Sequence, residues 1–278
     1  MSFKDIISLA SGVSLEKIPD GYQTIGNIML LKFFQTTGKK ERKTIADTCL
    51  KTFSNIETVC EINGIEGEFR IPKTTILASR ISKPTLETTH TENGIKFKID
   101  VGKIMFSKGN LSERQRLIGM IQKGETIVDM FAGIGYFSLG LAKHSPANRI
   151  YAVEKNRKAF DYLKQNIKLN GIRSIEPKRG DCRKIRIREK ADRVIMGYFP
   201  GTEKFLPHAF KFLKERGVVH YHNLYSDKEL WEKPLKDVEK AARKSGYRIV
   251  SITGRNVVKS YAPGIWHTCL DFAAESVS

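Results

Sequence analysis

The residues with the clearest chemical meaning form a glycine-rich turn between a short apolar run and an amphipathic one. The segment Thr126–Asp129 predicts a buried strand, and the run after the turn has helical apolar spacing. Gly133 and Gly135 between them allow a ligand to approach bare backbone. The next predicted strand, Arg149–Val153, ends at Glu154, a carboxylate suited to accept both hydroxyls of a ribose. This order predicts a nucleoside-cofactor site at the carboxyl end of a parallel sheet.

The charge beside the turn discriminates between nucleoside cofactors. A dinucleotide fingerprint has a third glycine where this chain has Ser138, and it holds a pyrophosphate at a helix N-terminus. Asp129 would repel a pyrophosphate but suits an ammonium group, which favours S-adenosylmethionine. Asp129 can also cap the turn, and both roles can hold together. Downstream, Asp181 can accept the adenine amine or cap a helix, and the Cys182 amide can donate to the adenine ring.

The elements around this site alternate between strand and helix. Helices are expected over residues 156–170, 205–215 and 235–245, and further strands over residues 193–197, 217–222, 247–253 and 268–273. From Glu125 onward the alternation predicts an α/β fold with a mostly parallel, doubly wound sheet. One more helix is expected before this alternating region, with Ser112 as its N-cap and Gln115 in its third helical position.

The first hundred residues predict a smaller α+β unit. Strands are expected over residues 25–33, 58–62, 75–79 and 95–101, and a basic helix over residues 40–53. Asn63-Gly64 and Asn93-Gly94 have the composition of hairpin turns. The strand from Ile95 alternates apolar and basic residues, which indicates one buried and one solvated face. We therefore expect two domains, residues 1–104 and 105–278.

Charge is the outlying property of the composition. The chain has 48 Lys and Arg against 30 Asp and Glu, a formal net charge of +18. This excess favours RNA or DNA as a partner, although a solvated basic surface is the alternative. The basic runs Lys39–Lys43 and Lys178–Arg193 are candidate phosphate contacts. Tyr261 and Trp266 can stack on a base or pack internally.

The cysteines and histidines do not have the spacing of a metal site. The four cysteines form no Cys-x-x-Cys pair, which argues against a zinc knuckle and a disulfide scaffold. His220 and His222 alternate on one strand and are expected to be buried or to line a cleft rather than bind metal. The N-terminus does not resemble a signal peptide, and no apolar run is long enough to span a bilayer. A cytoplasmic location is expected.

Six segments together carry a family resemblance: Asp129–Phe137, Glu154 with Asn156, Asn166–Asn170, Gly180–Cys182, Gly217–His222 and Lys259–Pro263. They resemble one group of S-adenosylmethionine enzymes, the archaeal and eukaryotic tRNA (guanosine-37-N1)-methyltransferases and their sister, the tRNA wybutosine-synthesising aminocarboxypropyltransferase. The resemblance extends from about Ile95 to Phe272. It implies a class I methyltransferase-like Rossmann fold preceded by a small α+β domain.

Two segments resemble the aminocarboxypropyltransferase branch. Ile195–Pro200 has no Asn where the methyltransferases carry an Asn-Pro type signature, and Gly109-Asn110 stands where they usually carry an Arg. The resemblance therefore implies that S-adenosylmethionine is a substrate. Its 3-amino-3-carboxypropyl group would be transferred to 4-demethylwyosine at position 37 of phenylalanine tRNA. The by-product would be 5′-methylthioadenosine. The alternatives are N1-methylation of guanosine 37 and a non-catalytic tRNA-binding protein.

The resemblance also implies roles for individual residues. Ser107 and Arg114 would hold the methionine end of the cofactor, while Glu154 would bind ribose. The other residues it assigns to the cofactor site are Asp129, Phe131, Gly133, Gly135, Lys155, Asp181, Cys182 and Gly197. From the residues alone, Arg114 is an ordinary solvated helix side chain and Ser107 a loop hydroxyl. No general base is singled out, no metal is expected, and the expected form is a monomer that binds the anticodon arm.

Overall fold

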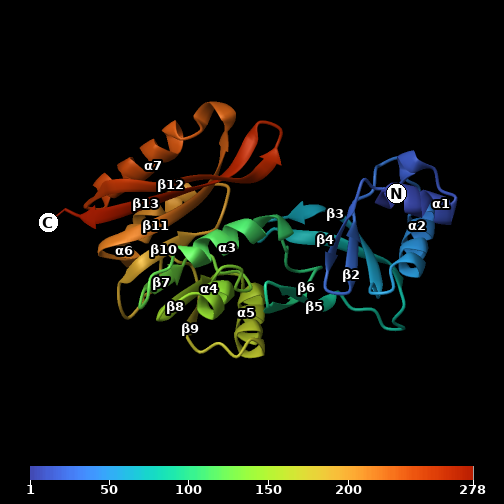
Figure 1. The fold of residues 1–278 in the computed structure, drawn as a ribbon, viewed down its shortest axis with the longest axis horizontal. Helices are drawn as coiled ribbons and strands as arrows, with labels where there is room; N and C mark the ends of the chain where they lie inside the picture. The colour runs from blue at the N-terminus through green and yellow to red at the C-terminus, as the bar shows by residue number, and fades with distance from the viewer. Residues whose placement is uncertain (278) are drawn as a thin grey trace. The chain divides into compact units, whose positions relative to one another are not determined.

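A computed structural model of the chain describes residues 1–277. The chain divides into two compact units, Met1–Phe106 and the part that begins at Ser107. Each unit has its own sheet (Figure 1). The larger, second unit contains every residue of the predicted cofactor site.

One twisted sheet organises the second unit. Its strands are β7 (Thr126–Asp129), β8 (Arg149–Glu154), β9 (Ile175–Arg179), β10 (Ala191–Met196), β11 (Leu213–Ser226), β12 (Tyr247–Ala262) and β13 (Ile265–Ser276). They pair in the order β12-β13-β11-β10-β7-β8-β9, and only β13 runs antiparallel to its neighbours. In the sheet, β8 and β9 lie on one side of β7, and β10 lies on its other side. Such a reversal opens a crevice at the carboxyl ends of the strands.

Helices cover the sheet in two groups. They are α3 (Leu111–Gly119), α4 (Ser138–His144), α5 (Arg157–Leu169), α6 (Leu206–Phe212) and α7 (Glu232–Lys244), with short 3₁₀ turns η2 (Lys108–Asn110), η3 (Thr202–Phe205) and η4 (Asp227–Glu229). The first group is α3 against α4, with α4 and α5 against β8. The second is α6 and α7, which contact each other and also β10 and β12. This is the predicted doubly wound α/β arrangement.

The two faces of this sheet differ in polarity. Strand alternation sends Val128, Val194 and Phe272 into an apolar cluster with residues of α6 and α7. The residues that alternate with them include Asp129 and Asp271, and both carboxylates are fully buried. One face of the sheet is therefore an ordinary core, whereas the other buries charge.

The first unit has a smaller sheet and a separate hairpin. Its elements are α1 (Phe3–Ser11), η1 (Leu15–Lys17), β1 (Tyr22–Ile25), β2 (Ile28–Leu31), α2 (Lys39–Thr52), β3 (Thr58–Glu66), β4 (Ile71–Ser79), β5 (Glu87–Glu92) and β6 (Ile95–Asp100). The sheet order is β1-β2-β3-β4, and β5 pairs with β6. Ile7, Met29, Ile45 and Val59 from its helices and strands are fully buried in one core.

Two predictions for this unit are confirmed. Asn93 and Gly94 form the two-residue turn between β5 and β6, both with positive φ (49° and 71°), as a hairpin of this kind requires. Along β6, Ile95 and Phe97 are buried while Lys96 is exposed.

Two other predictions for this unit are wrong. Residues 25–33 do not form one strand, because the chain reverses at Gly26 between β1 and β2. Asn63-Gly64 is not the hairpin turn, since it lies inside β3 where the pairing with β4 shifts by a bulge. The reversal instead occurs at Gly67–Arg70, where the Arg70 amide donates to the Gly67 carbonyl at 3.0 Å. Local composition marks a glycine-dependent irregularity but does not distinguish a bulge from a turn.

Several boundaries in the second unit also differ from prediction. The helix expected over residues 205–215 ends at Phe212, and β11 begins at the next residue. Strands β12 and β13 are longer than expected because they form one continuous hairpin. Ser112 does not cap α3, since the helix begins at Leu111 after the 3₁₀ turn η2.

Gly26 offers a test of the β1–β2 reversal. Its φ is +55°, and an added Cβ would lie 2.7 Å from the Thr89 carbonyl oxygen of β5. Gly12 has a φ of +70° but open space around it, so Gly12→Ala is the matched control. We expect Gly26→Ala to lower the free energy of unfolding by about 3 kcal/mol, and Gly12→Ala by about 1 kcal/mol. Urea unfolding of the full chain measures both, and equal losses would contradict the close approach of β5.

Candidate active site

The glycine turn joins the end of β7 to the start of α4. Gly133 and Gly135 have φ values of 58° and 102°, which other residues rarely adopt. A Cβ on Gly135 would lie 2.6 Å from Leu139, and one on Gly133 would lie 2.5 Å from the ring of Tyr136. Both glycines are therefore required, and the predicted strand–turn–helix unit is confirmed.

Asp129 braces this turn from beneath. Its side chain is fully buried and accepts bonds from the Ser138 hydroxyl at 2.6 Å and the Phe131 amide at 3.3 Å. Burial raises the pKa of Asp129 to about 6. The turn-capping role is present in the structure, whereas contact between this carboxylate and an ammonium group stays a prediction.

Glu154 lies at the end of β8 and joins that strand to the turn. Its carboxylate accepts the Gly133 amide at 2.7 Å on one oxygen and the Asn156 amide at 2.6 Å on the other, and the Lys155 backbone also bonds to it. Burial raises its pKa, against the effect of these bonds. Because a carboxylate accepts about four bonds, the group keeps capacity for a further donor such as a ribose hydroxyl.

Asp181 and Cys182 follow β9 at the same edge of the sheet. Arg183 pairs with the Asp181 carboxylate at 2.5 and 2.9 Å, and its amide donates to the same group at 3.0 Å. The bond from Arg183 is the main reason why the pKa of Asp181 is lowered to about 2. Asp181 therefore caps a tight turn rather than the start of a helix. The Cys182 thiol is buried, which raises its pKa to about 12 and leaves its backbone as the group for a ligand.

Arg114 is not the solvated side chain that its position in a helix suggests. It is almost fully buried, donates to the Ser107 carbonyl at 2.7 Å and lies over the ring of Tyr136, with 5.7 Å from the guanidinium carbon to the ring centroid. Lys259 of β12 donates to the Ser107 hydroxyl at 2.7 Å. Arg114 thus lies at the glycine turn, and Lys259, from a distant strand, bonds to the same Ser107. Lys259 was not predicted as a site residue, although it lies in one of the resembling segments.

The remaining predicted residues surround the turn less directly. The Phe131 ring stacks on Tyr198 at 5.1 Å between centroids. Gly197 follows β10, and a Cβ there would lie 2.6 Å from the ring of Phe137, so only glycine fits. Lys155 is exposed.

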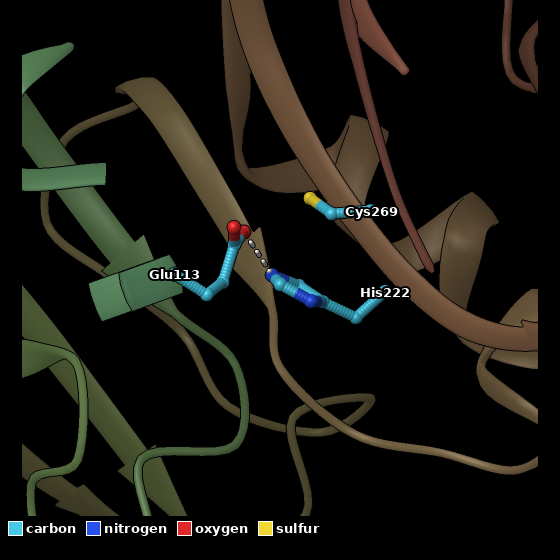
Figure 2. A group of neighbouring side chains, drawn as sticks. All are labelled: Glu113, His222 and Cys269. Atoms are coloured by element: carbon cyan, nitrogen blue, oxygen red, sulfur yellow. Dashed lines mark ion pairs between the residues drawn. The ribbon is translucent and has the colours of Figure 1, made fainter. Parts of the chain in front are cut away.

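A cluster of potential metal ligands lies between α3 and the sheet. Glu113, His222 and Cys269 are buried, and their ligand atoms lie within 4.8 Å of one another (Figure 2). Arg116, however, donates to both Glu113 oxygens at 2.8 Å and to the Cys269 sulfur at 3.5 Å. Arg116 already bonds to two of these three groups, so we assign no metal to the cluster. Both predicted histidines, His220 and His222, are fully buried.

The sheet order and the placement of the site define the class of protein. A glycine turn after the first parallel strand, an acidic residue after the second and an antiparallel strand inserted near the edge are the arrangement of an α/β methyltransferase fold. The family comparison agrees, because the TRM5/TYW2 methyltransferase domain matches residues 88–250 and the TYW2 N-terminal domain matches residues 4–79. The chain belongs to the TRM5/TYW2 family, and the predicted resemblance and fold class are confirmed.

Individual relatives come from both branches of this family. The chain is 41% identical over 256 residues to the tRNA(Phe) (4-demethylwyosine(37)-C(7)) aminocarboxypropyltransferase of Methanocaldococcus jannaschii, covering 92% of this chain and 98% of that protein. It is 34% identical to tRNA (guanine(37)-N(1))-methyltransferase Trm5b of Pyrococcus abyssi, covering 98% and 79%. The solved structure of M. jannaschii TYW2 in complex with AdoMet has a TM-score of 0.75 at 36% identity, covering 92% and 100%.

Among residues 1–277, no helix has both the length and the apolar character needed to cross a bilayer.

The buried Asp129 carboxyl predicts a pH dependence of stability. Its pKa is raised from 3.8 to about 6 on folding, so the native state holds the proton more tightly and stability falls as pH rises between these values. At about 1.4 kcal/mol per pKa unit, the loss amounts to about 3 kcal/mol. Urea unfolding at a series of pH values should show this loss in the wild-type chain relative to Asp129→Asn. A difference between the two proteins that does not vary with pH would contradict the assignment.

Proposed function

We propose that this chain transfers the 3-amino-3-carboxypropyl group of S-adenosylmethionine to 4-demethylwyosine at position 37 of phenylalanine tRNA, as the name of its M. jannaschii relative describes for that protein. The observation that carries the proposal is the place of Arg114. Its guanidinium is held at the glycine turn between Ser107 and Tyr136, where it can pair with an amino-acid carboxylate.

The residues at the turn fit the nucleoside part of this substrate. Glu154 keeps acceptor capacity for a ribose hydroxyl, and the turn presents glycine backbone beside it. Asp181 and the Cys182 amide stand one strand further along, where an adenine ring would extend. When bound, S-adenosylmethionine supplies a sulfonium whose three attached carbons are electrophilic.

The residues around Arg114 fit the amino-acid arm. Arg114 and Lys259 would provide two cations for its carboxylate, since Arg114 bonds to the Ser107 carbonyl and Lys259 to the Ser107 hydroxyl. The Tyr136 ring lies against the guanidinium of Arg114. Because the guanidinium is held by a hydrogen bond and a ring contact, the direction of the arm would be set before the RNA arrives.

Which carbon reacts is then a matter of geometry. With the arm directed toward the RNA, ring carbon C7 of the base forms a bond to the γ-carbon of the arm. The bond from that carbon to sulfur breaks, its electrons stay on sulfur, and 5′-methylthioadenosine leaves while the ring carbon loses its proton. The leaving group is already activated, so positioning supplies much of the rate. We assign no general base.

The same site would methylate if it turned the methyl group toward the RNA. The Trm5b relatives make this the nearest alternative. The segment after β10, Met196-Gly-Tyr-Phe-Pro200, contains no Asn that could orient a target nitrogen. This absence supports the aminocarboxypropyl reaction over guanosine N1-methylation.

The two transfers differ in which label reaches the RNA. The chain is incubated with tRNA that carries the 4-demethylwyosine precursor and with S-adenosylmethionine labelled in either the methyl or the carboxyl carbon. We expect only the carboxyl label in the tRNA, with one equivalent of 5′-methylthioadenosine released. Entry of the methyl label alone would replace this function by methylation, and no release of either product would favour a non-catalytic tRNA-binding protein.

A basic strip after β9 is our candidate contact with the tRNA backbone. We use the name basic strip for Lys184, Arg186 and Arg188. These three side chains are exposed, while Ile185 and Ile187 between them pack against the core. Within residues 1–277 no carboxylate lies at ion-pair distance from the strip, so its charges are available to phosphates. We propose that it contacts the anticodon arm.

Removing the basic strip should weaken tRNA binding without changing the cofactor site. We expect the triple variant Lys184→Ala, Arg186→Ala and Arg188→Ala to raise KM for tRNA about tenfold near physiological salt and to reduce the slope of log affinity against log salt by about two. KM for S-adenosylmethionine should not change. The matched control removes Lys240, Arg243 and Lys244, three exposed cations of α7. An equal effect of both triple variants would indicate net charge rather than a specific contact.

We also propose how the two units and the cell compartment relate to this reaction. Residues 105–278 would form the catalytic domain, and residues 1–104 a separate accessory domain. All four cysteines are buried free thiols, which supports a reducing compartment such as the cytoplasm.

A further inference from the structure

The sheet face beneath α3 buries several charged groups. Ladder partners place Ile195 beside His220 and His220 beside Asp271, so Arg193, His220 and Asp271 point to the same side. All three are buried. Buried charges rarely stabilise a fold more than apolar residues of similar volume would. This arrangement of buried charges is therefore better explained by a role other than stability.

A continuous chain of hydrogen bonds crosses this face. Arg193 donates twice to the Glu125 carboxylate at 2.8 Å and once to His220 Nε2 at 2.7 Å. Because an arginine side chain only donates, His220 Nε2 is an acceptor, and the proton resides on Nδ1. Nδ1 donates to Asp271 at 2.6 Å. His220 is thus neutral, in agreement with burial, which lowers its pKa.

The chain of bonds reaches α3 through Arg116. This guanidinium donates to the Asp271 oxygens at 2.6 and 3.3 Å and to both oxygens of Glu113 at 2.8 Å. Burial acts to raise the pKa of Asp271, but the bonds from His220 and Arg116 outweigh it and hold that pKa below its usual range. A Cβ on Gly254 would collide with the same carboxylate, so the bulged strand β12 needs glycine there.

Arg114 and Arg116 leave α3 on opposite sides. Two residues correspond to a rotation of about 200° around an α-helix. Arg116 therefore faces the sheet while Arg114 faces Ser107 and Tyr136 at the glycine turn. At the end of the helix, Arg193 donates to the Met120 carbonyl at 3.1 Å. The network thus holds both the rotation and the end of the helix that carries Arg114.

We propose that Glu113, Arg116 and Asp271 are positioning residues that set the rotation of α3 and thereby the place of the Arg114 guanidinium. The inference rests on the proposed function, in which Arg114 binds the carboxylate of the amino-acid arm. A helix free to rotate would displace that guanidinium and release the arm. The ion network under α3 would then act on the choice of the reacting carbon without touching the substrate.

Binding of two ligands separates positioning from folding. S-adenosylmethionine carries the arm, whereas 5′-methylthioadenosine has the same nucleoside without it. Arg116→Lys keeps the charge but cannot bond to two carboxylates as the planar guanidinium does. We expect this variant to lose about tenfold in affinity for S-adenosylmethionine and less than about twofold for 5′-methylthioadenosine, measured by isothermal titration calorimetry. Arg114→Met should show the same pattern with a larger loss.

Arg248→Lys is the matched control, because Arg248 pairs with Glu275 at 2.6 Å on the surface of the same sheet. It should change neither affinity. The inference is overturned if Arg116→Lys weakens both ligands equally, or if it spares S-adenosylmethionine while Arg114→Met does not. If Arg114→Met itself spares S-adenosylmethionine, the proposed role of Arg114 fails first. Should circular dichroism show that Arg116→Lys does not fold, Glu113→Gln provides the same comparison.

Discussion

The bonds between Arg116 and Asp271 join the helix that opens the larger unit to the last strand of its sheet, 155 residues away. Asp271 is charged and fully buried, so its carboxylate needs partners there, and Arg116 is the cationic one. The orientation of α3 depends on this contact, and the position of Arg114 depends on α3. The arrangement of the cofactor site therefore depends on the pairing of the buried Asp271 carboxylate with Arg116.

The site itself forms where the carboxyl ends of parallel strands meet. Glu154 at the end of β8 bonds to the Gly133 amide of the turn after β7, so two strands share one carboxylate. Asp129 supports the same turn from the interior. We propose that this frame binds the nucleoside, the part of the substrate that family members share whichever group they transfer. A different set of side chains, on α3 and β12, would orient the arm.

Local periodicity in the sequence predicts most elements of the second unit, whereas long-range packing overrides local signals at a few places. Strands β7, β8 and β10 and helix α5 lie within a few residues of their predicted bounds. The reversal at Gly26 was missed because the apolar residues on both sides read as one strand. Ser112 has the side chain of a helix cap, but the 3₁₀ turn before Leu111 starts the helix earlier. Asn63-Gly64 became a bulge because β3 continues pairing with β4 beyond it.

Local sequence alone predicts the strand, glycine turn and helix that follow Thr126, and the acidic residue at the end of the next strand. These depend on apolar period and on the freedom of glycine at positive φ, both local properties. The burial of Arg114 at the turn and the bonds of Arg116 to Asp271 depend on tertiary contacts. The physical reason is that a charged side chain is buried only where a partner is present. Here the partners, Tyr136 of the glycine turn for Arg114 and Asp271 of β13 for Arg116, are brought to α3 only by the packing of the whole unit.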